Sequence, residues 1–134
     1  MNIENQIKET IAMLDKAYAP YSQFHVSCLL VFNDETMIGG VNFENSSFGA
    51  TICAERNAVG SMITQGIDPE SISHIIIACN KDVSVQPCGI CRQTLIEFFP
   101  ATTKVVLTNQ FGEYSTTTLD ALLPNAFVGE QLNV

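Results

Sequence analysis

Apolar residues recur every three or four positions in several stretches of this 134-residue chain, which is the period of an amphipathic helix. The stretches that this pattern predicts to be helical are residues 3–18, 53–65, 87–99 and 119–123. The last three end at Gly66, Pro100 and Pro124, because glycine and proline interrupt helices. On the second helix, the inward face is predicted to consist of Ala58, Val59, Met62 and Ile63.

Shorter stretches rich in branched and apolar residues predict five strands. They cover residues 26–32, 37–42, 73–79, 104–108 and 114–117. The first two are separated by a short polar turn at residues 33–35, so they are expected to form a hairpin. The strand at residues 73–79 has a continuous apolar core at residues 75–79, which is typical of a strand covered on both faces. The order of these elements predicts an α/β protein in which helices cover a mixed sheet.

Composition and charge then limit the possible functions. The chain is 46% hydrophobic and 15% charged, a globular balance, and its length suits one domain covering residues 1–134. Its net charge of −8 argues against nucleic-acid and anionic-membrane partners. The longest apolar runs have five residues, whereas a membrane-spanning helix needs about twenty. The N-terminus does not resemble an export signal, so we expect a cytoplasmic protein. The number of cysteines, five, is odd, which excludes a complete set of disulfides within one chain and favours free or metal-bound thiols.

Three of the cysteines are spaced as metal ligands. Cys88 and Cys91 form a Cys-x-x-Cys pair directly after Pro87, where residues three apart share one face of a predicted helix. Cys53 also begins a predicted helix, and helix N-termini favour thiolates. Two such termini facing one another would hold a zinc ion with three thiolates. The fourth position would remain for water, which is typical of a catalytic zinc site.

Other interpretations of these residues stay open from spacing alone. A single Cys-x-x-Cys pair also occurs in redox proteins and in structural zinc sites, although the latter usually contain a second pair or two histidines. His25 and His74 are isolated on predicted strand segments, and we expect neither to bind metal. Cys28 and Cys79 lie within apolar runs and are expected to be buried side chains.

Glu55, two residues after Cys53, adds a carboxylate that could take a proton from a zinc-bound water. By itself it could equally be an ordinary acid favoured by the start of a helix. In combination, however, Cys-Ala-Glu followed by Pro-Cys-x-x-Cys is the known three-cysteine form of the zinc deaminase signature. The combination therefore favours a zinc-dependent deaminase.

The chain resembles the small, three-cysteine, homotetrameric cytidine deaminases over nearly its whole length. The matching segments are residues 18–24, 42–45, 53–56, 87–93 and 122–127. This resemblance implies a three-layer α/β/α fold with a mixed five-stranded sheet. It also implies zinc-dependent hydrolysis of cytidine and deoxycytidine to uridine, deoxyuridine and ammonia, as in pyrimidine salvage.

The same resemblance implies roles for individual residues. One Zn²⁺ per subunit would be bound by Cys53, Cys88 and Cys91, and zinc-activated hydroxide would attack C4 of the base while Glu55 moves protons. The residues expected to contact substrate are Phe24, Asn42, Glu44, Ala54 and Phe127.

Among these substrate residues, Asn42 and Glu44 would bind the ribose 3′-hydroxyl. Phe24 would contact the pyrimidine within its own subunit, and Phe127 would reach the site of a neighbouring subunit in a homotetramer. Taken singly, each of these four residues could instead have an ordinary structural role.

The arginines of the chain, Arg56 and Arg92, both lie beside expected zinc ligands. Three thiolates outweigh the charge of Zn²⁺, so we expect Arg56, and secondarily Arg92, to compensate the excess negative charge. The alternative is that both arginines are ordinary solvated surface residues. The chain departs from the usual family pattern at Phe48, where many relatives have tyrosine, and at Ser27-Cys28, where smaller residues are usual.

Two alternative functions are weighed against the leading one. A related zinc deaminase could act on a modified cytosine nucleoside or a nucleoside antibiotic, but Asn42 and Glu44 favour an ordinary ribose. A non-catalytic zinc protein serving assembly needs neither an open coordination position nor Glu55. We therefore expect a nucleoside substrate, with no nucleic-acid or membrane partner.

Overall fold

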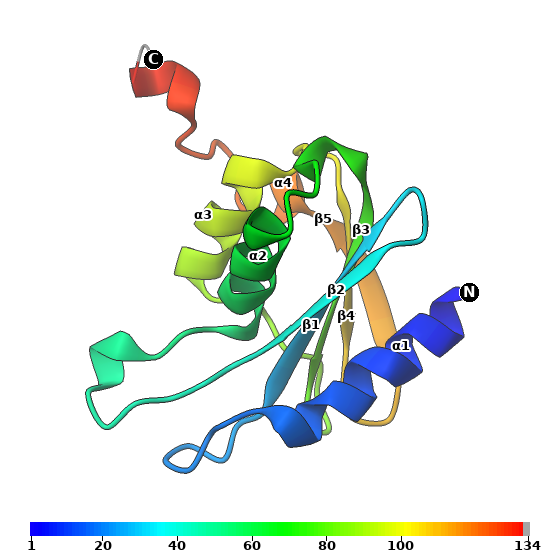
Figure 1. The fold of residues 1–134 in the computed structure, drawn as a ribbon, viewed down its shortest axis with the longest axis vertical. Coiled ribbons are helices and arrows are strands. Elements are labelled where there is room, and N and C mark those ends of the chain that lie inside the picture. Colours follow the sequence, from blue (N-terminus) through cyan, green and yellow to red (C-terminus); the bar gives the residue numbers. More distant parts are fainter. Residues whose placement is uncertain (133–134) are drawn as a thin grey trace.

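The computed structural model describes residues 1–132, in which a five-stranded sheet lies between two layers of helices (Figure 1). The strands are β1 (Val26–Phe32), β2 (Met37–Val41), β3 (Ile72–Cys79), β4 (Lys104–Thr108) and β5 (Tyr114–Thr118). The α-helices are α1 (Ile3–Ala12), α2 (Ala54–Thr64), α3 (Gly89–Phe98) and α4 (Leu119–Leu122). Short 3-10 helices cover Met13–Lys16, Phe48–Ala50, Pro69–Ser71 and Gly129–Leu132.

The sheet is mixed, with the strand order β2-β1-β3-β4-β5. β1 is antiparallel to both of its neighbours, β2 and β3, and β4 is antiparallel to β5. β3 and β4 are parallel. Parallel strands need a crossover connection, which α3 provides. The expected mixed sheet of five strands is therefore confirmed.

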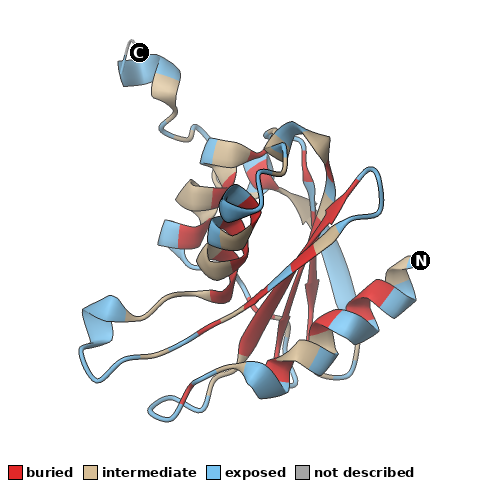
Figure 2. Cartoon of the chain, viewed as in Figure 1, coloured by how far each residue is buried: buried red, intermediate tan, exposed pale blue. Residues whose placement is uncertain are grey.

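Helices cover both faces of this sheet, which gives the expected three-layer α/β/α arrangement (Figures 1 and 2). On one face, α1 packs through Ile7 against Ile76 and Val106. On the other face, Met62 of α2 and Leu95 of α3 belong to the larger core cluster. Each fully buried aliphatic side chain stabilises the fold by about 1.5–3 kcal/mol. Burial on both faces explains why residues 75–79 of β3 are apolar without alternation.

The predicted elements agree with the structure except in details. The first helix was expected to reach residue 18, but its last turn is the 3-10 helix Met13–Lys16. α3 ends at Phe98 because Phe99 precedes Pro100 and is extended, with φ −110° and ψ 152°. The prediction for Ile63 was wrong, since this side chain is 53% exposed. It follows the buried Met62 by about 100° around the helix and so points away from the core.

The remaining apolar predictions can be checked against burial. Cys28 and Cys79 are buried, as expected for small core side chains.

Within residues 1–132, every helix lacks the length and apolar character that crossing a membrane would require.

Candidate metal centre and active site

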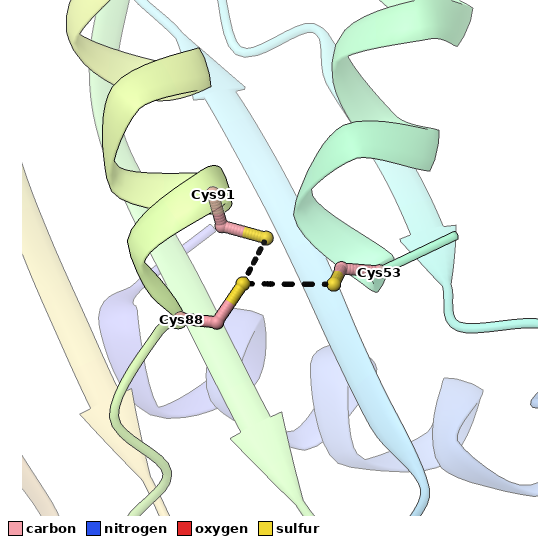
Figure 3. Close-up of side chains that lie close together, drawn as sticks. All are labelled: Cys53, Cys88 and Cys91. Atoms are coloured by element: carbon pink, nitrogen blue, oxygen red, sulfur yellow. Dashed lines mark hydrogen bonds between the residues drawn. The ribbon is translucent and has the colours of Figure 1, made fainter. Parts of the chain in front are cut away.

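The N-termini of α2 and α3 bring three cysteines together (Figure 3). Cys53 is the N-cap residue of α2, Cys88 is the N-cap residue of α3, and Cys91 lies in the first turn of α3. The Sγ atom of Cys88 lies 3.8 Å from that of Cys53 and 3.4 Å from that of Cys91. All three sulfurs lie within 4.8 Å of one another, although Cys53 and Cys88 are 35 residues apart in the sequence.

These sulfurs fit a zinc ion. Two sulfurs bound to one tetrahedral zinc at about 2.3 Å each are about 3.8 Å apart, and the measured spacings lie close to this value. Thiolates are soft ligands that suit zinc. Neither Cys53 nor Cys88 uses its sulfur to cap a backbone N–H group. Three protein ligands leave one tetrahedral position for water or substrate, as in catalytic zinc sites.

The surroundings of Cys53 favour its thiolate form. Its pKa is lowered to about 5, first by interaction with the Cys91 thiol and further by Cys88 and the guanidinium of Arg56. The same interaction with Cys53, together with burial, raises the pKa of Cys91. A low thiol pKa beside a cationic side chain is typical of a metal-binding or reactive cysteine.

The two arginines are oriented differently. Arg56 donates from Nη2 to the carbonyl oxygen of Thr51 at 3.0 Å, and its buried Nε has no hydrogen-bond partner within residues 1–132. Arg92 donates from Nε to the carbonyl of Pro87 and from Nη1 to that of Leu122, both at 2.7 Å. Arg56 therefore has a donor left for the site, whereas these bonds of Arg92 brace the backbone around α3.

Glu55 lies in the first turn of α2 and is only 3% exposed. Its pKa is raised, chiefly by burial and also by the charge of Cys53. A carboxyl group with a raised pKa can both accept and return a proton near neutral pH. Glu55 therefore has the properties of a general acid–base next to the three sulfurs.

A pocket of about 220 Å³ opens beside the cysteines. Its lining includes two of the three clustered cysteines, Cys53 and Cys88, and also Glu55. It also includes four of the residues expected to contact substrate, namely Phe24, Asn42, Glu44 and Ala54. Sequence reasoning assigned no site role to five further lining residues, which are Ser22, Val26, Thr51, Val85 and Gln86. Ser22 lies within the matching segment 18–24. The other four carry no motif signal, because uncharged residues of ordinary types become pocket walls only through the tertiary fold.

Asn42 and Glu44 are already hydrogen-bonded within the chain. Asn42 accepts from the backbone N–H of Val26 and donates to the carbonyl of Phe24, both at 2.9 Å. Glu44 accepts from the N–H groups of Tyr21 and Ser22 at 3.0 and 3.2 Å, and from the Ser22 hydroxyl.

The Ser22 hydroxyl is the main reason why the pKa of Glu44 is lowered. Glu44 is thus an ionised acceptor with a fixed orientation at the pocket wall. Each carboxylate oxygen and amide oxygen has two acceptor positions, so both Asn42 and Glu44 retain capacity for a ligand.

Phe127 is not part of this pocket. It is 54% exposed, on a C-terminal segment that extends away from the helices and the sheet (Figure 1). Its carbonyl oxygen accepts a hydrogen bond from Gln93 of α3 at 2.8 Å.

Phe48, on the long loop between β2 and α2, is 76% exposed and contacts the ring of Tyr21 edge-on. His25 and His74 lie outside the cysteine cluster, where their rings bond to the Leu14 carbonyl and Gln6.

Comparisons with known proteins agree with this geometry. A family model described as the cytidine and deoxycytidylate deaminase zinc-binding region matches residues 1–108. The chain is 41% identical over 128 residues to the cytidine deaminase of Mycoplasma genitalium, covering 95% of this chain and 96% of that one. It is 40% identical over 133 residues to the cytidine deaminase of Halalkalibacterium halodurans, covering 99% of each. A crystal structure of cytidine deaminase from Burkholderia pseudomallei matches with a TM-score of 0.90 at 41% identity, covering 95% of this chain and 100% of that one.

Proposed function

This chain belongs to the cytidine and deoxycytidylate deaminase family, and we propose that it hydrolyses the 4-amino group of cytidine and deoxycytidine, with zinc as its cofactor. The reaction consumes water and yields uridine or deoxyuridine and ammonia. The observation that carries this function is a pocket, lined by Cys53, Cys88 and the buried carboxyl group of Glu55, beside a cluster of three sulfurs that could hold a metal ion.

Zinc held by Cys53, Cys88 and Cys91 supplies the Lewis acidity that makes water nucleophilic at neutral pH. Glu55 accepts a proton as water attacks C4 and passes it to N3 of the base. It then takes the proton of the new C4 hydroxyl and delivers it to the amino group, so that the C4 carbonyl forms, the C4–N bond breaks and ammonia leaves. Its burial and raised pKa support this double role, which needs a carboxyl group that changes protonation readily.

The pocket wall holds the nucleoside. Phe24 packs against the pyrimidine, and Asn42 and Glu44 bind the ribose 3′-hydroxyl through their remaining acceptor positions. Ala54 is the first residue of α2, so its backbone N–H group has no partner within the helix. Ala54 lines the pocket, and this N–H group can donate to the carbonyl oxygen of the base. Because the 2′ position has no assigned contact, both cytidine and deoxycytidine are accepted.

Charge compensation by Arg56 belongs to the same proposal. The buried Nε, which has no hydrogen-bond partner among residues 1–132, and the lowered pKa of Cys53 support a guanidinium that withdraws negative charge from the thiolates. The same role for Arg92 stays a prediction, with less support, because its hydrogen bonds run to the carbonyls of Pro87 and Leu122.

We also propose that the chain works as a single cytoplasmic domain, residues 1–134, in a homotetramer whose sites are completed by Phe127 of a neighbouring subunit. Phe127 does not line the pocket of its own chain, which leaves its ring free to reach the site of a neighbour. The exposed rings of Phe48 and Phe127 support burial against another copy. Native mass spectrometry should give the mass of four chains, and a fully active monomer would contradict this assembly.

One assay tests the proposed function. Zinc per chain is quantified in the purified protein, and loss of cytidine and deoxycytidine is followed by ultraviolet absorbance. We expect about one zinc per chain and turnover of both nucleosides. Bound zinc without turnover of either would refute the proposed substrates and favour a modified cytosine nucleoside or a non-catalytic role.

A further inference from the structure

We propose that Asn80 is a positioning residue for nucleoside binding, because its side chain fixes the segment that presents Phe24 to the pocket. Asn80 directly follows β3 and does not line the pocket. The inference rests on the proposed contact between Phe24 and the pyrimidine. It adds a residue to which neither the motifs nor the pocket lining points.

The carboxamide of Asn80 bonds to both sides of Phe24. Its Nδ2 donates to the carbonyl oxygen of Gln23 at 3.0 Å, and its Oδ1 accepts from the backbone N–H of His25 at 3.0 Å. The backbone N–H of Asn80 also donates to the carbonyl of His25 at 3.1 Å. Asn80 therefore holds the residue before Phe24 and the residue after it.

Asn42 completes the arrangement from the other side. It donates to the carbonyl of Phe24 and accepts from the N–H of Val26, so its bonds alternate with those of Asn80 along four successive residues. The segment 23–26 is thus held by two side chains, one beyond β2 and one beyond β3. Since β2 and β3 are the two neighbours of β1, both asparagines bind the chain as it enters β1.

This restraint matters because the segment is strained. Gln23 has φ +57°, the left-handed region that residues other than glycine seldom adopt. Its side chain is exposed, so packing of that side chain does not hold the conformation. Its N–H donates to the carbonyl of Ala19, and its own carbonyl is the one bound by Asn80. Without the Asn80 donor, the turn that aims Phe24 at the pocket loses its restraint on this side.

A carboxamide is needed at residue 80 because it donates and accepts at the same time. Asn80→Asp keeps an acceptor for His25 but turns the donor into a carboxylate oxygen facing the carbonyl of Gln23. Asn80→Ala removes both bonds. The matched control is Asn33→Asp, which makes the same charge change in the exposed turn between β1 and β2.

The test measures kcat and KM for cytidine in these variants, after confirming full zinc content. Contacts made equally in the ground and transition states affect KM and leave kcat unchanged. We expect Asn80→Asp to raise KM about fivefold, the size of one lost hydrogen bond, and Asn80→Ala, which loses two, to raise KM at least as much, both with kcat within about twofold. Asn33→Asp should leave both constants unchanged.

A double-mutant cycle with Phe24→Ala tests whether Asn80 acts through that ring. Phe24→Ala alone should raise KM, and adding Asn80→Ala should raise it no further. An unchanged KM in both Asn80 variants, or an equal rise on the Phe24→Ala background, would overturn the positioning role. An unchanged KM in Phe24→Ala itself would instead refute the ring's contact with substrate in the proposed function.

Discussion

The backbone of Gly40 on β2 lies so close to Ala58 on α2 that a Cβ atom at residue 40 would be 2.5 Å from the Ala58 nitrogen. The same atom would lie 2.6 Å from the carbonyl oxygen of Ala54, the first residue of α2. Contacts this short involve backbone on both sides and cannot be relieved by moving a side chain. The close approach therefore sets the position of the helix that begins beside Cys53 and carries Glu55.

Gly40→Ala should destabilise the fold by roughly 1–3 kcal/mol, as expected of a methyl group forced into a packed contact. It should also lower kcat, because α2 must shift. The free energy of unfolding in urea and the turnover of cytidine measure these effects. Gly60→Ala on the exposed side of α2 is the control, since a Cβ there meets nothing within 4 Å. It should stabilise the helix by about 0.5–1 kcal/mol. Equal stability of both variants would contradict the packing argument.

Glu55→Gln should retain zinc and the fold, because glutamine has nearly the same shape and Glu55 is not one of the three clustered ligands. The proton route disappears, so kcat should fall at least about 100-fold. Zinc per chain and circular dichroism serve as controls beside the kinetic measurement. Near-normal turnover by the zinc-loaded variant would exclude the acid–base role of Glu55.

Cys88→Ala should lose zinc and stability together, since metal binding to thiolates is linked to folding. Cys28→Ala provides a matched control, because Cys28 is buried in the core and lies outside the cysteine cluster. It should lose some packing energy but keep about one zinc per chain. Zinc analysis and thermal unfolding, each with and without a chelator, distinguish the two variants. Retention of zinc by Cys88→Ala would remove this residue from the ligand set.

Arg56→Gln should lower kcat about tenfold while changing KM less, within the range seen when residues that support metal ligands are removed. The reason is that the thiolates would keep negative charge that the guanidinium is proposed to withdraw. Arg56→Lys, which preserves the charge, should recover part of the activity. A variant that only raises KM would indicate that Arg56 binds substrate instead.

Stability should depend on pH through His74. Burial, and to a smaller extent Lys104, lower its pKa in the folded chain below the ordinary value of 6.5. As pH falls through about 6.5, the unfolded chain therefore takes up a proton that the folded chain does not, and the free energy of unfolding decreases.

His74→Asn should remove this contribution. The difference in the free energy of unfolding between the unaltered chain and the His74→Asn variant should therefore become smaller as pH falls from about 7.5 to about 5.5. Lys104→Met should weaken the same pH dependence, because it removes the positive charge that opposes protonation of His74. Urea unfolding at both pH values measures the effect. A difference in the free energy of unfolding between His74→Asn and the unaltered chain that is the same at both pH values would contradict the role of His74.

Local patterns explain why most of the fold and the zinc ligands were predictable. The apolar period of α1 and α2, the uninterrupted apolar run of β3 and the Cys-x-x-Cys pair are all contained within short segments. The parallel pairing of β3 and β4 also follows the usual rule that a parallel pair needs a crossover, which α3 provides.

What could not be predicted depends on how distant segments meet. Ile63 lies on the boundary of a helical face, and only packing decides whether it is covered. Val85 and Gln86 join the pocket because the loop after β3 passes beside it. Asn80 bonds to residues more than fifty positions earlier in the chain, and its own sequence neighbours give no sign of this.

Most of the proposed nucleoside contacts and the metal ligands come from different parts of the chain. Phe24, Asn42 and Glu44, which are proposed to hold the nucleoside, lie in the first third of the sequence, whereas the clustered sulfurs begin at Cys53. Substitutions at these three positions therefore leave the clustered cysteines and Glu55 in place. During divergence, a lineage can acquire a new nucleoside preference by altering the early loops while it inherits the same hydrolytic chemistry unchanged.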